Sequence, residues 1–576
     1  MRRQTVLRTV TTPLLGVWLV AFASSSCSVI TDSDIAAGGI GQACSSDDDC
    51  QGASCDQGAC VVTCSGDGDC PARSRCWGGR CFAGTVVGEA CSNNADCQGA
   101  LCADGICVTA CSDGSGTTEC PGNSECFNRT CQNRLKVAGV WIGLAASTEG
   151  WTLTHHEGVL ASQEKLGYVD YVYDEALLGP DAEKAIDKFV AEGTQVIIAN
   201  SFDYVSIVHK KSDEYPNTAF LLCSGLPREP NVASYFAHLE QAWYVAGRVA
   251  ARKTLRNHLG FIGSFANAEV IRHINAFTLG ARSEKPDINV EVRWLGFWYD
   301  VAFNETLFEY TALHLGEDAT KKRLTGEEYL TAKLIDSGAD VITHNLDNQL
   351  TSRYIGLHTV AGTLRDPQNT SGNFTVWSIA NDNRYGWRDQ SGQPYVNAIG
   401  SVYWNWEPLY TTMFEAIHHR TLQAINYQTP LLADTARSVV GFGLSAAETG
   451  ITTLTVDKLL QEAEDMKPEG VFRGPISQTG QRKAGDIPEG VAISEDEWRT
   501  MCWYVDGVKE RLNPNDPTSD LVDALVPSAE HPGKIGDQKE PSEPTKRQPT
   551  TAPEMLVDLG TNGAIWDCNA NSRGPN

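Results

Sequence analysis

Between Leu135 and Val508 the chain alternates short, nearly continuous apolar runs with amphipathic stretches. The apolar runs predict strands buried on both faces: Val137 to Leu144, Gln195 to Ala199, Ala219 to Leu222, Leu259 to Phe265, Val290 to Phe297, Ala339 to Thr343 and Phe374 to Ala380. The amphipathic stretches predict helices at Asp181 to Ala191, Ala268 to Arg282 and Tyr329 to Ser337. Strands that alternate with helices indicate an α/β fold with doubly wound parallel sheets, and the length of this region is enough for two lobes.

Ligands of such sheets bind beyond the carboxyl ends of the strands. Polar and aromatic residues follow several of the predicted strands: Trp151, Thr152 and His155, then Phe202 and Asp203, then Trp298 and Asp300, then Asn345 and Asp347, then Asn381 and Asp382. Aromatic rings stack on flat ligands, and carboxylates accept hydrogen bonds from ring N–H groups or sugar hydroxyls. This pattern predicts a neutral, planar, hydrogen-bonding small molecule rather than an anion.

The first 27 residues have the order of an export signal. Arg2, Arg3 and Arg8 precede an apolar run from Pro13 to Ala23, three serines and Cys27. The run is too short to span a bilayer, which needs about 20 residues. Small residues before Cys27 resemble a bacterial lipoprotein signal, which predicts lipidation of Cys27 and a membrane anchor. Plain secretion and a twin-arginine route are the alternatives.

Sixteen of the 20 cysteines cluster between residues 41 and 131, after a linker at 28–40. They are Cys44, Cys50, Cys55, Cys60, Cys64, Cys70, Cys76, Cys81, Cys91, Cys97, Cys102, Cys107, Cys111, Cys120, Cys126 and Cys131. Two sets of eight run in parallel, so the region is a duplicated unit. Segments this short need covalent closure, and the exported compartment is oxidising, which favours disulfides of unassigned pairing over zinc. Calcium at the Asp-rich turns is a further alternative, and the module is a candidate contact site for a protein partner.

The formal net charge of −26 argues against nucleic-acid binding, which needs clustered cations, and is also an ordinary solution to solubility. Nucleophile elbows, phosphate loops and dinucleotide fingerprints are absent from the sequence, so we expect no enzyme activity and no cofactor. The His155-His156 and His418-His419 pairs have no third ligand nearby in sequence, so we expect no metal site. The proline-rich tail at 509–576 is predicted to be largely disordered, with a possible bridge between Cys502 and Cys568.

Several motifs carry a family resemblance: Asn231-Val232-Ala233-Ser234-Tyr235, Tyr244-Val245-Ala246-Gly247, the block from Glu269 to Arg282, Gly338-Ala339-Asp340-Val341 and the run from Trp503 to Val508. With them, residues 135–508 resemble the basic membrane protein (BMP) family of ABC-transporter substrate-binding lipoproteins. The resemblance implies a two-lobed type I periplasmic-binding fold, purines or nucleosides as ligands, and an ABC permease and ATPase as partners.

The resemblance also implies a set of cleft residues. Trp151 matches the aromatic residue that stacks on the base, His155 matches a histidine of close relatives, and Asp382 matches the acidic residue at the polar edge of the ligand. Phe202, Trp298, Asp347 and Trp406 fall on other cleft positions, whereas Thr152 and Trp404 stand where relatives have other residues. The alternatives are core packing for the tryptophans and helix capping for Asp347 and Asp382. These residues predict an exported binding protein that closes its lobes over a ligand, or alternatively a surface sensor or interaction lipoprotein that is not coupled to transport.

Overall fold

The computed structural model describes residues 131–145, 150–264, 266–296, 298, 308–318, 322–367, 369–389, 391–419, 421–448, 450–479 and 485–510, together with short strands between residues 54 and 130. The chain divides into two compact units, Met1–Ala110 and Cys111–Asn576, each of which is considered by itself. Cys27, the linker and the tail beyond residue 510 lie outside the described residues.

Four short antiparallel hairpins lie in the cysteine-rich region, and their two strands pair in the same way in each hairpin. They are β1 (Ser54–Asp56) with β2 (Ala59–Val61), β3 (Ser74–Trp77) with β4 (Arg80–Ala83), β5 (Leu101–Ala103) with β6 (Ile106–Ala110), and β7 (Ser124–Phe127) with β8 (Thr130–Asn133). Two cysteines stand opposite each other in every hairpin: Cys55 and Cys60, Cys76 and Cys81, Cys102 and Cys107, Cys126 and Cys131. The duplicated module and its disulfides stay predictions.

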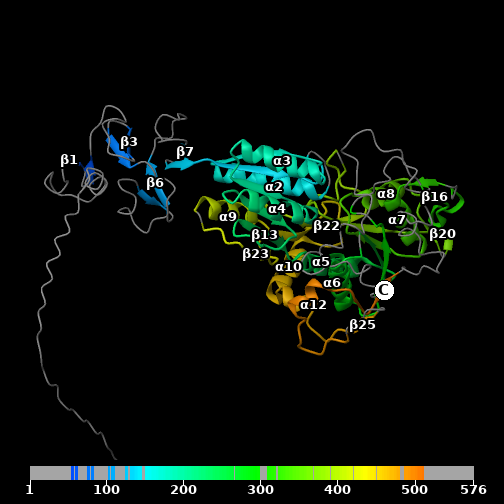
Figure 1. The fold of residues 1–576 in the computed structure, drawn as a ribbon. Coiled ribbons are helices and arrows are strands. Elements are labelled where there is room, and N and C mark those ends of the chain that lie inside the picture. The colour runs from blue at the N-terminus through cyan, green and yellow to red at the C-terminus, as the bar shows by residue number, and fades with distance from the viewer. Residues whose placement is uncertain are drawn as a thin grey trace, which may run out of the picture. The chain divides into compact units, whose positions relative to one another are not determined.

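The first lobe is built on a six-stranded parallel sheet (Figure 1). Its order is β10 (Val169–Asp174), β9 (Leu135–Val140), β11 (Val196–Ala199), β12 (Ala219–Cys223), β13 (Val232–Ala237) and β23 (Asn426–Thr429). The helices of this lobe are α2 (Trp151–Leu166), α3 (Pro180–Ala191), α4 (Val205–Glu214) and α9 (Glu407–His418), with the 3-10 turn η4 (Phe202–Tyr204) after β11. The order places β9 second, between the edge strand β10 and β11, as in the 2-1-3-4-5 order of doubly wound sheets.

The second lobe contains a seven-stranded sheet, in the order β24 (Val440–Leu444), β22 (Ala398–Trp404), β21 (Trp377–Ala380), β18 (Val341–His344), β14 (His258–Gly263), β15 (Asn289–Trp294) and β27 (Val508–Glu510). All neighbours are parallel except β22 and β24. Its helices are α5 (Leu239–Lys253), α6 (Ala268–Glu284), α7 (Gly326–Asp336), α8 (Leu350–Val360) and α10 (Thr453–Met466). Smaller elements are η5 (Leu313–Asp318), α11 (Pro468–Val471), α12 (Glu495–Arg499), β16 (Phe308–Tyr310), β17 (Lys322–Leu324), β19 (Arg365–Asp366), β20 (Asn369–Asn373), β25 (Gln478–Thr479) and β26 (Tyr504–Val505).

The chain passes between the two sheets three times. It crosses from β13 through α5 to β14, returns from β22 through α9 to β23, and crosses again from β23 to β24. One apolar core is shared by both lobes and includes buried residues of β9, β14, α5, α6 and α9. Two further cores lie within single lobes, under α3 and α4 in the first and under α7 and α8 in the second. The structure therefore confirms the predicted α/β fold, with one parallel sheet and one sheet that is parallel except for the β22–β24 pair.

The predicted strands are found, but three of them are shorter than the apolar pattern suggested. The first ends at Val140 rather than Leu144, the fourth at Gly263 rather than Phe265, and the last begins at Trp377 rather than Phe374. Beyond these ends Phe374 and Val376 are buried, whereas Leu144 is exposed. Strand β27 also continues through Lys509 into the segment assigned to the tail, because it pairs with β15.

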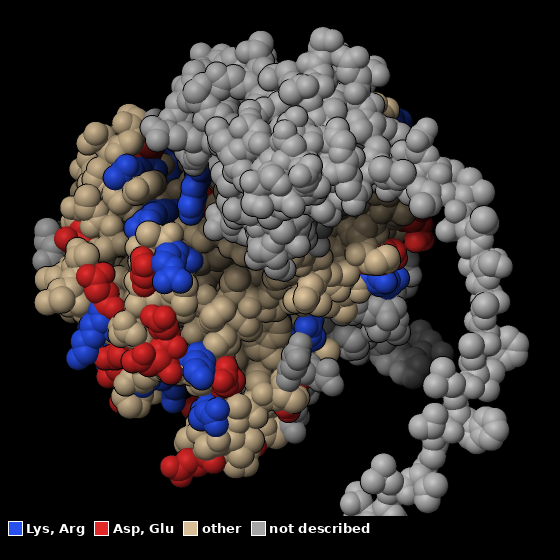
Figure 2. All heavy atoms as spheres, turned by 90° about the vertical axis from the view of Figure 1, so that its left-hand side faces the viewer, with Lys and Arg blue, Asp and Glu red and all other residues tan. Residues whose placement is uncertain are grey.

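The larger unit carries acidic and basic side chains side by side on the face shown in Figure 2. Such mixing fits the solubility interpretation of the negative charge. Among the described helices, none combines the length and the apolar character needed to cross a bilayer. Cys502 is disulfide-bonded and Cys223 is a free, buried thiol, but the predicted partner Cys568 lies outside the described residues.

Candidate ligand-binding site

The amino end of α2 lies where the two lobes meet. Gly150 precedes this helix with φ of 104°, and a Cβ built on it would stand 2.8 Å from the carbonyl oxygen of Asp347, which follows β18 in the second lobe. Only glycine adopts this backbone conformation readily. The backbones of the two lobes therefore approach each other closely at this point.

Trp151 and Thr152 are fixed by hydrogen bonds within the first lobe. The Trp151 Nε1–H donates to the carbonyl oxygen of Asn200 over 2.6 Å. The Thr152 hydroxyl oxygen accepts from the Gly143 N–H at 3.0 Å and from the Asn200 amide at 3.3 Å. Thr152 is buried, and its hydroxyl supports the loop after β9. Its predicted contact with a ligand stays a prediction.

An aromatic cluster joins α2 to the segment after β22. The Trp151 ring meets His155, Trp404 and Trp406 edge-on, with centroids 4.5, 5.3 and 5.6 Å away. The Trp404 and Trp406 rings are stacked at 4.8 Å with an interplanar angle of 8°. Phe236, at the end of β13, packs against Trp404 at 5.0 Å. Residues from both lobes and from two of the lobe crossings therefore form one aromatic wall.

His155 lies behind this wall. It is fully buried, stacks on Trp406 at 4.4 Å, and shares a hydrogen bond of 2.5 Å between its Nδ1 and the Tyr410 hydroxyl. The Tyr410 hydroxyl is also 2.6 Å from that of Tyr235. Burial lowers the pKa of His155 well below its ordinary value, so the imidazole is neutral. The stacking contact and the hydrogen bond allow His155 to hold the Trp406 ring in position.

Three carboxyl groups gather on the second lobe. Asp382 is 4% exposed, and its Oδ1 accepts from Trp404 Nε1 at 3.2 Å and from Asn381 Nδ2 at 2.9 Å. Burial raises the pKa of Asp382 to about 7, and burial together with the Asp382 charge raises the pKa of Asp347 well above its ordinary value. Burial likewise raises the pKa of Glu269, in the first turn of α6, to about 7, with Asp382 adding to the shift and Arg272 opposing it.

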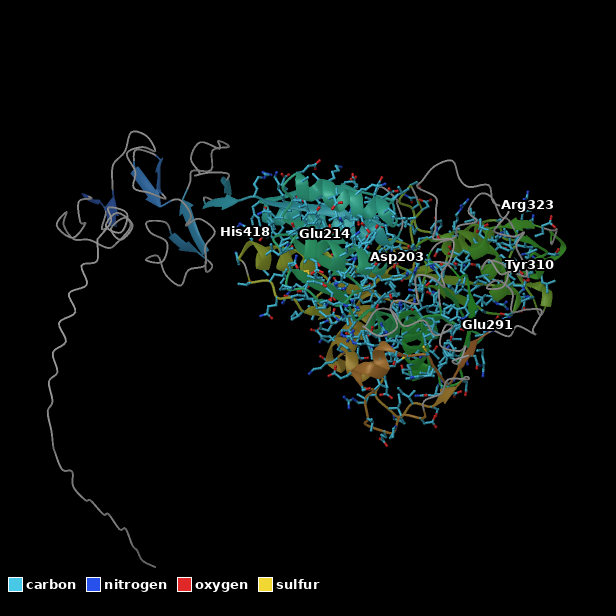
Figure 3. All side chains as sticks on the ribbon, viewed as in Figure 1. Asp203, Glu214, Glu291, Tyr310, Arg323 and His418 are labelled. Carbon is cyan, nitrogen blue, oxygen red and sulfur yellow. The ribbon has the colours of Figure 1, made fainter. Side chains whose placement is uncertain are left out.

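Phe202 and Trp298 flank the cleft from opposite lobes, with ring centroids 6.4 Å apart. Trp298 is tied to Asp347, whose N–H donates to the Trp298 carbonyl oxygen at 2.8 Å. Asp203, next to Phe202, lies on the side of the first lobe toward the second in Figure 3. Burial raises the pKa of Asp203 to about 6, and the hydrogen bond with Ser201 opposes the shift.

The structure brings the predicted residues into one connected group. Trp151, His155 and Trp406 share ring contacts, Phe202 faces Trp298, and Asp347 connects Trp298 to Asp382. Two site residues were missed. Trp404 was noted only as a departure from the family, and Glu269 only as part of a motif. Each gains its place through contacts that the linear sequence does not show.

The ligand-free protein is expected to lose stability as pH rises from about 4.5 to about 7. Folded Glu269 holds its proton up to a pKa of about 7, while in the unfolded chain it ionises near its ordinary value, so the folded state binds more protons in this window. Glu269→Gln should reduce the decline and, at pH 8, raise the free energy of unfolding by up to about 3 kcal/mol. Chemical denaturation at pH 5 and pH 8 measures the effect.

Glu164→Gln is the matched control, because Glu164 is exposed on α2 and the charge change is identical. This control should leave the pH profile within error of the wild type. If Glu269→Gln leaves the dependence of stability on pH unchanged, Glu269 does not have the raised pKa that burial is expected to give it.

The chain is similar in sequence to several known proteins. Residues 136–311 match the family described as ABC transporter substrate-binding protein PnrA-like. A purine-binding protein of Brucella abortus is 31% identical over 220 residues, covering 38% of this chain and 56% of the relative. A Haloferax volcanii protein, TsgA13, described as an ABC transporter glucose-binding protein, is 25% identical over 290 residues, covering 50% of this chain and 63% of the relative.

The chain thus spans about half to two thirds of the length of these relatives. Among solved structures, a solute-binding protein of an ABC transporter system from Conexibacter woesei aligns with a TM-score of 0.43 at 17% identity, covering 58% of this chain and 96% of that one. One relative is named for purine binding and the other for glucose binding, so these names do not indicate a single ligand.

Proposed function

We propose that this chain is the extracytoplasmic substrate-binding protein of an ABC-type uptake system and that it captures a purine, a nucleoside or a related planar heterocycle. The observation that supports this best is the boundary between the lobes, where Trp151, Trp298, Trp404 and Trp406 lie close to the carboxyl groups of Asp347 and Asp382. Such a boundary offers flat apolar surfaces and hydrogen-bond acceptors together. The family match over residues 136–311 supports the same role.

Capture proceeds through closure of the lobes. Gly150 and Trp151 belong to the first lobe, while Asp347 and Asp382 belong to the second, so a ligand in this cleft contacts both. A ligand that binds both sides stabilises the closed form over the open one by its differential affinity. The neutral, buried His155 keeps Trp406 in place from behind, without taking part in proton transfer.

Lipidation of Cys27 would hold the protein at the outer side of a membrane, and an ABC permease and ATPase would receive the ligand. In the sequence, the duplicated cysteine-rich module lies between the anchor and the binding lobes. These assignments rest on the signal-like first 27 residues and on the family match. A sensor that is not coupled to transport remains the second candidate, and the absence of permease and ATPase genes from the genomic neighbourhood would favour it.

The ligand class is tested on the full-length protein. The purified protein is denatured, and the released small molecules are identified by mass spectrometry. Calorimetry then compares purines, nucleosides and glucose. We expect an aromatic heterocycle to be released and to bind again, and glucose to bind at least about tenfold more weakly. Preferred binding of glucose, or no binding of any heterocycle, would overturn the proposal.

Trp151→Ala is expected to weaken binding of the identified heterocycle by about 5-fold to 150-fold, the range of about 1–3 kcal/mol found for stacking on one aromatic side chain. Tyr173→Ala is the control, since Tyr173 is an aromatic on β10 that is 39% exposed. Titration calorimetry measures both variants. Equal affinities for wild type and Trp151→Ala would remove Trp151 from the ligand site.

A further inference from the structure

Trp404, the last residue of β22, holds Asp382 through two hydrogen bonds. The Trp404 backbone N–H donates to the Asp382 carbonyl oxygen at 3.0 Å, and its indole Nε1–H donates to the Asp382 Oδ1 at 3.2 Å. Both residues are 4% exposed. One tryptophan therefore fixes the backbone and the carboxyl group of the residue two positions beyond the adjacent strand β21.

The backbone of Asp382 depends on such contacts. Its φ of 64° lies in the left-handed region, which residues other than glycine adopt rarely. A residue in this region keeps its conformation where the surrounding structure imposes it, and such residues gather at functional sites. Here the unusual conformation falls on a candidate ligand-binding residue.

The two side chains that donate to Asp382 act on the same carboxyl oxygen. The Trp404 indole N–H and the Asn381 Nδ2, at 2.9 Å, both donate to Oδ1. Neither of these nitrogens can accept a hydrogen bond, so Oδ1 stays an acceptor and the proton of neutral Asp382 is confined to Oδ2. Asp382 also shares a hydrogen bond with the Asp347 carboxyl group. Trp404 thus limits which oxygen donates and which accepts.

The ring of Trp404 contacts aromatic side chains of the first lobe. Trp151 of α2 meets it edge-on with centroids 5.3 Å apart, and Phe236, at the end of β13, lies 5.0 Å away. The Trp406 ring stacks on it at 4.8 Å. Trp404 therefore connects aromatic residues of the first lobe to a carboxyl group of the second.

Trp406 shows what a tryptophan does in the same stack when it serves packing alone. It is fully buried, and its Nε1–H has no hydrogen-bond partner among the described residues. The two stacked rings therefore differ in one respect, because only the Trp404 N–H is bonded to a carboxyl group. This difference separates a positioning role from a packing role.

We propose that Trp404 is a positioning residue of the ligand site, whose indole N–H fixes the Asp382 carboxyl group for the ligand and whose ring joins that carboxyl group to Trp151 and Phe236 of the first lobe. This inference rests on the proposed capture function and deepens it, since it names the residue through which Asp382 is controlled. Trp404 acts on the ligand through Asp382.

The first test is a double-mutant cycle on the full-length protein. Trp404→Phe keeps an aromatic ring and removes the N–H, and Asp382→Gly removes the carboxyl group at a backbone conformation that glycine adopts readily. Calorimetry at pH 7 uses adenosine, inosine, guanosine and any heterocycle released from the purified protein. Trp404→Phe should weaken binding of the tightest probe by about tenfold, the effect of losing a hydrogen bond to a charged group, and by less than about twofold in the Asp382→Gly background.

Trp406→Phe is the matched control, because it removes an indole N–H that has no hydrogen-bond partner among the described residues. Its effect on affinity should be the same with and without the Asp382 carboxyl group. Chemical denaturation of every variant reports loss of fold separately from loss of affinity.

The second test needs no ligand. In the proton–nitrogen correlation spectrum, the Trp404 indole signal is identified by its absence from Trp404→Phe. This signal should move between pH 5 and pH 9 as Asp382 ionises, and the movement should disappear in Asp382→Gly. The same movement should persist in Trp406→Phe.

The outcomes separate this inference from the function on which it rests. Unchanged affinity in Trp404→Phe, an equal loss in the Asp382→Gly background, or a Trp404 indole signal that does not respond to Asp382→Gly overturns the inference and leaves ligand capture intact. If Asp382→Gly binds too weakly to measure, the affinity of Trp404→Phe and the indole signal decide. If the wild type binds no heterocycle and releases none, the proposed function fails and the inference fails with it.

Discussion

Gly150→Ala is expected to lower the affinity for the ligand by about a hundredfold or more, equivalent to about 2.7 kcal/mol. The new Cβ would lie 2.8 Å from the Asp347 carbonyl oxygen, a backbone atom of the opposite lobe that cannot rotate away. The closed form loses this contact, whereas the open form has room for the methyl group. Calorimetry measures the affinity, and small-angle scattering with and without ligand measures closure.

A second variant separates the clash from backbone strain. Gly392 also has a positive φ, of 79°, but a Cβ built there meets nothing within 4 Å. Gly392→Ala should therefore carry a strain of about 1 kcal/mol and bind ligand like the wild type. If Gly150→Ala binds ligand with unchanged affinity, Gly150 and Asp347 do not approach each other in the liganded protein.

Gly280→Ala is expected to destabilise the protein by more than about 3 kcal/mol. In the structure α5 and α6 pack so closely that a Cβ on Gly280 would stand 2.0 Å from the Tyr244 carbonyl oxygen, and a Cβ on Gly247 would stand 2.0 Å from that of Phe277. The clash involves backbone on both sides, so the helices must separate. Since α5 connects the two lobes, ligand binding should weaken as well.

Gly356→Ala provides the matched helical control. Gly356 lies within α8, and its added Cβ would stand 3.3 Å from a side-chain atom of Tyr395. Because alanine has a helix propensity about 1 kcal/mol better than that of glycine, this variant should stay within about 1 kcal/mol of the wild type. Thermal and chemical denaturation measure both. A Gly280→Ala protein as stable as Gly356→Ala would show that the helices are farther apart than described.

The strands that the apolar pattern predicted are buried on both faces, which is why their pattern is continuous. Strand β11, for example, is buried at all four positions. Strand β10 was missed because it lies at a sheet edge and exposes about half of its residues. Strand β22 was missed although all seven of its residues are buried, because Gly400 and Ser401 interrupt the apolar run.

The candidate site was predicted where it depended on strand ends and was missed where it depended on the crossings between lobes. Trp151 and Asp382 follow strands, so the fold rule alone selects them. Trp404 reaches Trp151 only because β22 leads into α9, which returns to the first lobe. Glu269 looks like an ordinary first-turn acid of a helix, and its electrostatic role follows from its position beside Asp382 and near the other lobe.

By itself the sequence determined the class of the fold, the repeated cysteine spacing and the strand-end residues of the candidate site, because periodicity and spacing are local properties of the chain. Only the tertiary structure decided which of these residues meet, since His155 and Tyr410 are 255 positions apart in the chain and yet share a hydrogen bond. Burial in the folded chain then raised the pKa of Glu269 and Asp382. These pKa values therefore depend on the packing of the two lobes and cannot be obtained from the order of the residues.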